Sequence, residues 1–111
     1  MADLARLQKA LGISFSDQSL LEQALVHSSY VNENPDFALT SNERLEFLGD
    51  AVLGSVVAEK LYHDFPHLAE GEMTKLRSAL VRGDTLTRVA RALNLGDYLY
   101  LGKGEETSDG R

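Results

Sequence analysis

Residues 41–63 read SNERLEFLGDAVLGSVVAEKLYH, a run with helical apolar spacing throughout and no proline. At 3.6 residues per turn, this run is long enough for about six helical turns. The pair Phe65-Pro66 follows and stops the helix, because proline cannot continue it. The sequence therefore predicts one long central helix, whose core-facing stripe consists of Leu45, Leu48, Val52 and Val56.

The segments on both sides of the central helix also have helical spacing. We expect further helices at 4–11 with Gly12 as C-cap, after Ser16 as N-cap, from Glu70 to Gly83, and from Asp84 as N-cap toward Gly96. Residues 31–36 are rich in turn formers and predict a loop, while residues 98–101 are short, apolar and ambiguous. Because no two strand-like runs flank a tight turn, the predicted fold class is all-α.

The composition indicates a single domain. The chain has 111 residues, of which 43% are hydrophobic, enough for one core without disulfide support. It has no cysteine, which excludes disulfide frameworks, thiolate catalysis and cysteine-ligated metal centres. No apolar run approaches the ~20 residues of a membrane span, and the N-terminus does not resemble a signal peptide. We therefore expect a soluble protein of the cytoplasm.

The charge is negative overall and unevenly placed. Eleven Lys and Arg against seventeen Asp and Glu give a net charge of −6, which argues against a protein that coats phosphate without the help of a metal. Residues 73–93 carry five basic side chains against one acid, a local charge of +4. This strip is either a surface for a polyanion or the solvated side of two helices, and composition alone favours the second interpretation.

Three carboxylates lie on one face of the predicted central helix. At about 100° per residue, Glu43, Glu46 and Asp50 project within roughly 60° of one another and away from the apolar stripe. No basic residue lies three or four positions from Glu46 or Asp50. Mg²⁺ would relieve their mutual repulsion and could share its open positions with a phosphodiester. The pattern therefore predicts metal-assisted hydrolysis of a nucleic acid, in which the bound ion makes an acidic face attractive to phosphate.

Structural explanations stay open for parts of this run. Glu43 follows Thr40 at the spacing of a capping box, so helix capping explains it at least as well as metal chemistry. Asp50 is a poor helix former in a mid-helix position, between glycines at 49 and 54. Each glycine costs about 1 kcal/mol relative to alanine, which predicts a close approach to this part of the backbone.

Two aromatic side chains also have alternative explanations. Phe47 points away from the apolar stripe, so it either packs against another helix or serves as an exposed anchor for a partner subunit. His27 lies near a helix end, where a cation or a hydrogen-bonding ring is favoured for structural reasons.

The run from Asn42 to Ala51, NERLEFLGDA, closely resembles the motif of the bacterial ribonuclease III family. The likeness extends to the segments 27–30, Phe65-Pro66, 70–73 and 80–86. The resemblance implies an all-helical endonuclease domain that forms a homodimer and cleaves both strands of double-stranded RNA. The implied products have 5′-phosphate and 3′-hydroxyl ends, and the implied roles are the processing of rRNA and mRNA.

Carried over by position, the resemblance assigns the site residues. Glu46 and Asp50 would be catalytic ligands of Mg²⁺, which Mn²⁺ can replace, with Asp50 closest to the activated water. Glu43 and Glu70 would be supporting carboxylates near the RNA. Phe47 would be the aromatic knob that enters a socket on the partner subunit.

The chain departs from the family pattern at its C-terminal end. Residues 1–101 resemble an incomplete nuclease domain, and residues 102–111 read as a flexible loop or tail with three glycines. The family continues into a helix with an Asp and a Glu that complete the metal site, and usually into a double-stranded-RNA-binding domain; this sequence contains neither. We therefore expect a C-terminally truncated nuclease domain, whose two carboxylates hold Mg²⁺ weakly and whose cleavage activity is nearly absent.

Two other functions stay open. One is a non-catalytic helical module that dimerises through Phe47, and the other is a metal-dependent helical hydrolase that acts on nucleotides. A following helix with paired acids would favour the nuclease over the non-catalytic module. Consumption of duplex RNA rather than nucleoside triphosphates would exclude the nucleotide hydrolase.

Overall fold

The computed structural model describes residues 2–107, and the regular secondary structure of these residues is almost entirely helical. The helices are α1 (Leu4–Leu11), α2 (Gln18–Ala24), α3 (Ser28–Glu33), α4 (Glu43–Asp64), α5 (Glu70–Leu80), α6 (Gly83–Ala92), the 3-10 helix η1 (Leu95–Tyr98) and α7 (Lys103–Thr107). Within these residues the only β-type pairing is an isolated parallel bridge between Val26 and Tyr100. The predicted all-α fold class is confirmed.

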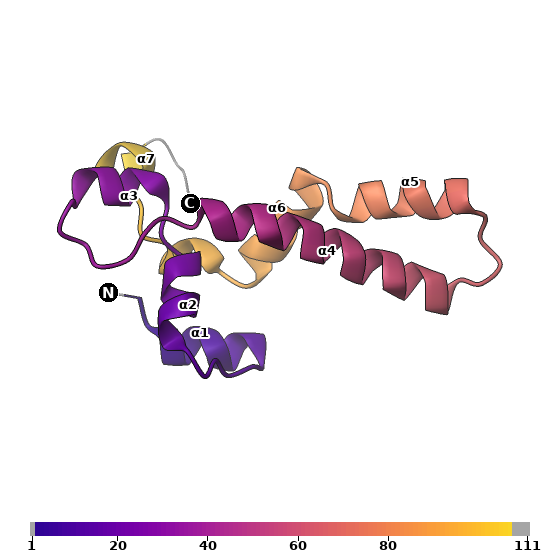
Figure 1. The fold of residues 1–111 in the computed structure, drawn as a ribbon, viewed down its shortest axis with the longest axis horizontal. Coiled ribbons are helices and arrows are strands. Elements are labelled where there is room, and N and C mark those ends of the chain that lie inside the picture. The colour runs from indigo at the N-terminus through magenta and orange to yellow at the C-terminus, as the bar shows by residue number, and fades with distance from the viewer. Residues whose placement is uncertain (1, 108–111) are drawn as a thin grey trace.

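The molecule consists of a lobe and an arm (Figure 1). The lobe, residues 2–42 and 95–107, brings α1, α2 and α3 together with η1 and α7 from the other end of the chain. The arm, residues 43–92, is formed by α4 running outward, α5 returning beside it and α6 leading back to the lobe. The Cα radius of gyration is 16.4 Å and the extents are 53 × 31 × 24 Å. A compact chain of this length would have a radius of about 13 Å, so the arm makes the molecule elongated.

The buried core lies in the lobe. Its buried side chains are Leu7, Leu21, Leu25, Val26, Tyr98, Tyr100 and Leu101. The Ala2 amide donates to the Tyr100 hydroxyl at 3.0 Å, and the Tyr100 ring lies 5.3 Å from that of Tyr30 and 5.7 Å from that of Phe37, centre to centre. Contacts between residues far apart in the sequence therefore hold the lobe together.

The C-terminal segment is joined to α3. The Gly102 amide donates to Ser29 Oγ at 2.8 Å, and the Lys103 amide donates to Glu33 Oε1 at 3.2 Å at the start of α7. The prediction of a loop over residues 102–111 is therefore wrong for 103–107, because a carboxylate of α3 supplies the acceptor that starts a helical turn. Residues 108–111 lie outside the described part of the chain.

Several helix boundaries differ from the sequence predictions. Asp17, and not Ser16, is the N-cap of α2, because its carboxylate accepts from the Ser19 amide at 3.0 Å. The predicted loop 31–36 begins inside α3, which starts where the His27 ring accepts from the Ser29 amide at 3.1 Å. His27 is therefore at the N-terminal end of a helix and acts there as a hydrogen-bond acceptor.

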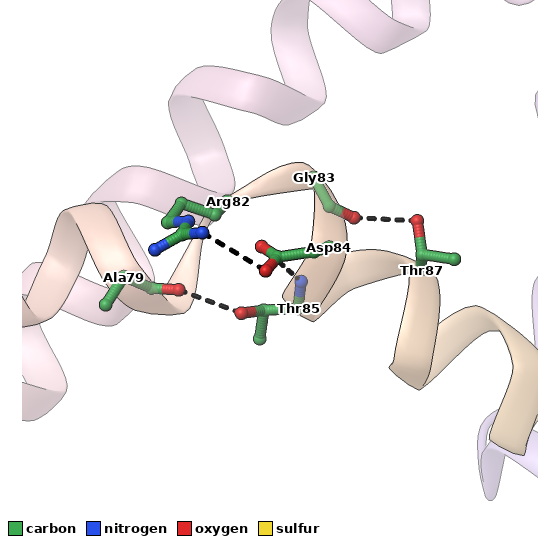
Figure 2. A network of polar contacts seen from close by, with 6 residues as sticks. All are labelled: Ala79, Arg82, Gly83, Asp84, Thr85 and Thr87. Carbon is green, nitrogen blue, oxygen red and sulfur yellow. Dashed lines mark hydrogen bonds and ion pairs between the residues drawn. The ribbon is translucent and has the colours of Figure 1, made fainter.

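The turn between α5 and α6 is held by a local polar network (Figure 2). Thr85 Oγ1 donates to the Ala79 carbonyl of α5 at 2.9 Å, and the Arg82 guanidinium pairs with Asp84 at 3.2 Å. Asp84 also accepts from the Thr85 amide at 3.0 Å, so it lies in the first turn of α6. The N-cap of α6 is Arg82, and the prediction of Asp84 as N-cap is wrong.

The predicted core stripe of the central helix is not buried. Leu48, Val52 and Val56 are 59%, 52% and 59% exposed, and Leu45 is half-buried. In the arm, the only buried side chain is Leu61, which lies on the side of α4 that α5 covers. The spacing correctly identifies an apolar face, but no element within residues 2–107 covers it. None of the helices described in this range is both long and apolar enough to cross a membrane.

Candidate metal-binding face of α4

The first turn of α4 is fixed to the lobe by hydrogen bonds. The Asn42 amide donates to the Val26 carbonyl at 2.8 Å, and its side-chain Nδ2 donates to the Ala24 carbonyl at 2.9 Å. Gln23 Nε2 donates to Thr40 Oγ1 at 2.8 Å. Sequence reasoning missed these residues as determinants of the site. The only available signal was the position of Asn42, an amino acid strongly favoured at N-caps, inside the predicted helix start.

The three acids lie on one exposed face of α4, as predicted. Glu43, Glu46 and Asp50 are all exposed. The ion pairs within residues 2–107 are Lys60–Asp64 and Arg82–Asp84, so no base neutralises the three acids. Neither Glu46 nor Asp50 has a side-chain hydrogen bond in the described chain. Their carboxylates are therefore free to bind a cation.

Glu43 differs from the other two acids because it has a local partner. Ser41 Oγ donates to Glu43 Oε1 at 3.1 Å and accepts weakly from the Glu43 amide at 3.4 Å. The contact is therefore made by Ser41 and not by Thr40, the capping partner that the spacing predicted. Glu43 thus contributes to the helix start, which leaves Glu46 and Asp50 as the two free ligands.

The donor set fits a hydrated, weakly held Mg²⁺ ion. Within residues 2–107, no group of three or more His, Cys, Asp or Glu side chains could hold a metal. Mg²⁺, however, commonly keeps several waters and binds proteins through only one or two carboxylates together with substrate phosphates. Glu46 and Asp50, one helical turn apart, match that pattern on an open surface.

Glu70 lies away from these acids. It begins α5 and lines a cavity of about 480 Å³ between α4 and α5, together with Glu59, Tyr62 and Arg77. Glu59 lies 13 residues beyond Glu46 on α4, which corresponds to about 20 Å along the helix axis. The fold therefore does not bring Glu70 to Glu46 and Asp50 within one chain.

Phe47 is the most exposed large apolar side chain among those described. It is 84% exposed, so it does not pack against another helix within residues 2–107. It borders a groove of about 830 Å³ at the start of α4, which Gln23, Thr40 and Leu48 also line. Packing against another helix is therefore not observed in the described chain, and the role of Phe47 as an anchor for a partner subunit stays a prediction.

The mid-helix glycines have no close neighbour in the described chain. A Cβ atom added at Gly49 or Gly54 would meet nothing within 4 Å. The close approach that these glycines predicted is therefore not made within residues 2–107. In the basic strip, Arg82 pairs with Asp84 and Arg77 lines the α4–α5 cavity, so part of its charge is used inside the arm.

Comparison with known proteins identifies the family. Residues 17–111 match the Ribonuclease-III-like family. The chain is 60% identical to Ribonuclease 3 of Dehalococcoides mccartyi over all 111 residues, which are 47% of that protein. It is 54% identical to Ribonuclease 3 of Enterococcus faecalis over 95% of this chain and 46% of that protein. The chain thus spans about half the length of these relatives.

Solved structures agree with this result. Two structures of the nuclease domain of ribonuclease III from Campylobacter jejuni superpose with TM-scores of 0.86 and 0.85, at 42% and 43% identity. The matches cover 97% and 99% of this chain and 71% of each of those chains. One of the two is described for structural flexibility in a region involved in dimer formation. In sequence and in fold, the chain belongs to the ribonuclease III family.

Proposed function

We propose that this chain forms the part of an Mg²⁺-dependent endoribonuclease that carries Glu46 and Asp50, and that the enzyme cleaves double-stranded RNA in rRNA and mRNA processing. Family membership supports this proposal. The observation that carries it is the pair of free, exposed carboxylates one turn apart on α4. In a chain with net charge −6, such a face attracts RNA phosphate only when it holds a cation.

Each residue has a defined task in the proposed reaction. Glu46 and Asp50 would hold the ion, and Asp50 would orient the attacking water. When bound, the ion, for which Mn²⁺ could substitute, would supply water activation and charge stabilisation at the departing oxygen. Water adds to phosphorus, the bond from phosphorus to O3′ breaks, and O3′ takes up a proton. The products therefore carry a 5′-phosphate and a 3′-hydroxyl.

A homodimer accounts for two further residues. Phe47 projects from the acid-bearing turn and would insert into the partner copy, where burial of an aromatic ring stabilises an interface. Glu70 lines the cavity at Glu59, which lies about 20 Å along α4 from Glu46, so Glu70 would support a scissile bond held by the other copy. Residues 1–101 would form the nuclease part of the chain, and the cytoplasm would be its compartment, since the sequence has no cysteine.

A hybrid enzyme tests the proposal. Residues 1–111 replace the matched 47% of the Dehalococcoides mccartyi relative, and the product is incubated with Mg²⁺ and either duplex RNA or nucleoside triphosphates. We expect cleavage of duplex RNA. Asp50→Asn should reduce turnover by at least about 100-fold while RNA binding stays largely intact.

Glu59→Gln is the matched control, because Glu59 is an exposed acid on the opposite face of the same helix. It should leave turnover unchanged. Unchanged turnover in Asp50→Asn would contradict the assignment. A hybrid that dimerises without cleaving RNA would support the non-catalytic module, and one that consumes only triphosphates would support the nucleotide hydrolase.

The 111-residue chain alone should cleave duplex RNA barely or not at all, because two carboxylates hold Mg²⁺ weakly. The same assay measures this activity. Substantial Mg²⁺-dependent cleavage by the isolated chain would contradict the inference that two carboxylates are too few to hold the ion for catalysis.

A further inference from the structure

Three successive carbonyls of the lobe bind partners from two other parts of the chain. The Leu25 carbonyl accepts from the Tyr100 amide at 2.9 Å. The carbonyls on either side of it, Ala24 and Val26, both accept from Asn42, through the side chain at 2.9 Å and the backbone at 2.8 Å. Ala24 ends α2 and Leu25 is its C-cap, so Asn42 and Tyr100 both bind the carbonyls at the end of this helix and just beyond it. The segment itself is anchored, because Val26 is fully buried.

The side chain of Asn42 does not perform the task usual at its position. An asparagine N-cap normally accepts a hydrogen bond from the second or third amide of its helix. Asn42 makes no such bond, and its Nδ2 points back to the lobe instead. The weak capping contact comes from Ser41, whose hydroxyl accepts from the Glu43 amide at 3.4 Å. Helix capping therefore does not explain the choice of asparagine here.

Asn42 also makes the first backbone hydrogen bond of α4. Its carbonyl accepts from the Glu46 amide at 2.8 Å, so one residue connects residues 24–26 of the lobe to the backbone of a proposed metal ligand. Elsewhere α4 packs mainly against α5, which belongs to the arm. The direction of the acidic face relative to the lobe therefore depends strongly on the contacts of Asn42.

We propose that Asn42 is a positioning residue, which sets the direction in which Glu46 and Asp50 face relative to the lobe. This inference rests on the proposed function, because it assumes that the two acids bind a metal ion. Loss of the bond from Asn42 to the Ala24 carbonyl leaves both acids on α4 but lets the start of the helix tilt. The ion would then move relative to the lobe while its distance to α4 stays the same.

Paramagnetic relaxation by Mn²⁺ measures this geometry. We would add substoichiometric Mn²⁺ to the ¹⁵N-labelled 111-residue chain and compare relaxation of the Val26 and Tyr100 amides with that of Val57, further along α4. The ratio cancels differences in affinity. Asn42→Ser is the main variant, because serine is itself a good N-cap but is too short to reach the Ala24 carbonyl. Asn42→Ala is the second variant.

Asn34→Ala is the matched control, since Asn34 Nδ2 likewise donates to a backbone carbonyl, that of Tyr30 at 2.9 Å, at the end of α3. We expect both Asn42 variants to change the lobe-to-α4 ratio by about twofold or more, and the control to leave it unchanged. A residue that only stabilises the fold would lower the melting temperature without moving the ratio.

The outcomes separate this proposal from the proposed function. Relaxation centred on residues 46–50 with unchanged ratios in the Asn42 variants overturns the role of Asn42 alone. Absence of relaxation at residues 46–50 in the unsubstituted chain overturns the metal assignment and this inference together. If Asn42→Ala fails to fold, the ratio in Asn42→Ser decides.

Discussion

The lobe and the arm differ in how many of their apolar side chains are buried. Seven of the eight buried apolar side chains of the described chain lie in the lobe, and only Leu61 lies in the arm. The lobe is assembled from both ends of the chain through contacts such as that of Ala2 with Tyr100. The arm consists of consecutive helices, and its apolar stripe on α4 remains exposed. A helix can therefore have regular apolar spacing even where no other element of the described chain covers its apolar side chains.

This difference also bears on function. The proposed metal-binding face begins where α4 leaves the lobe, so Glu46 and Asp50 stand on the arm while Asn42 is tied to the lobe. Exposed apolar surface of the kind found on α4 is typical of sites that bind another polypeptide. We therefore expect the lobe to determine the stability of the isolated chain, and the arm to respond to association.

Truncation of the core should have the largest effect. Leu7 is 1% exposed, so Leu7→Ala should lower the free energy of unfolding by about 2–5 kcal/mol. Val56→Ala on the arm removes a side chain that is 59% exposed and should change it by less than about 0.5 kcal/mol. Urea denaturation measures both. Equal losses in the two variants would show that the stripe on α4 is covered in solution.

Substitution of Gly102 tests the junction between α3 and α7. A Cβ atom there would lie 2.9 Å from the Ser29 carbonyl oxygen and would also clash with the Glu33 carboxylate. Gly102→Ala should therefore destabilise the lobe by about 1–3 kcal/mol. Gly104→Ala is the control, because nothing lies within 4 Å of its Cβ position. Thermal unfolding of the two variants should differ clearly, and equal melting temperatures would argue against the close contact at Gly102.

Replacement of Gly49 by alanine should raise the stability of the chain instead of lowering it. Gly49 lies in α4, where an added methyl group would have no atom within 4 Å, so Gly49→Ala should stabilise the isolated chain by about 0.5–1 kcal/mol. Gly12→Ala is the contrasting control, because Gly12 has φ 71° and alanine is strained there. Denaturation at several protein concentrations makes the measurement. Destabilisation by Gly49→Ala that grows with concentration would reveal a second copy packed against this backbone.

The smallest effect is on the pH dependence of stability. Hydrogen bonds from the Ser19 hydroxyl and amide lower the pKa of Asp17 in the lobe below 3.8. Its contribution is therefore present above that pH and is lost as the pH falls through the lowered value. In the arm, the hydrogen bond and charge of Asp64 raise the pKa of Lys60 above 10.5, so that contribution is lost as the pH rises through the raised value.

Two substitutions distinguish the contribution of Asp17 at low pH from that of Lys60 at high pH. Ser19→Ala should flatten the acid limb of a plot of stability against pH, and Asp64→Asn should flatten the alkaline limb. Both groups are fully exposed, so the changes should be small. The assignment fails if Ser19→Ala alters only the alkaline limb or Asp64→Asn only the acid limb.

The elements predicted correctly are those whose determinants are local. The spacing and caps of α1 and the spacing of α4 lie within their own segments, and so does the shared face of Glu46 and Asp50. Helices α3 and α7 were missed because their starts depend on the His27 ring and on Glu33, a residue 70 positions away from Lys103. A period identifies an apolar face but not the element that covers it, which explains the wrong prediction of a buried stripe.

The same limit applies to the candidate site. The spacing along one helix predicted the two free carboxylates, but no spacing could place Glu70 at the far end of α4. The role of Asn42 also depends on carbonyls 16 and 18 positions earlier in the chain, at Val26 and Ala24. Sequence patterns therefore predicted the two exposed carboxylates, and tertiary contacts determine how the start of α4 is held.

The most direct test of the central claim is a titration of the 111-residue chain with Mn²⁺, followed by electron paramagnetic resonance. Four proteins would be compared: the unsubstituted chain, Glu46→Gln, Asp50→Asn and the opposite-face control Glu59→Gln. We predict weak binding to the unsubstituted chain and to the control, and affinity lower by at least about tenfold in Glu46→Gln and Asp50→Asn. Equal affinity in all four proteins would contradict the assignment of Glu46 and Asp50 as metal ligands.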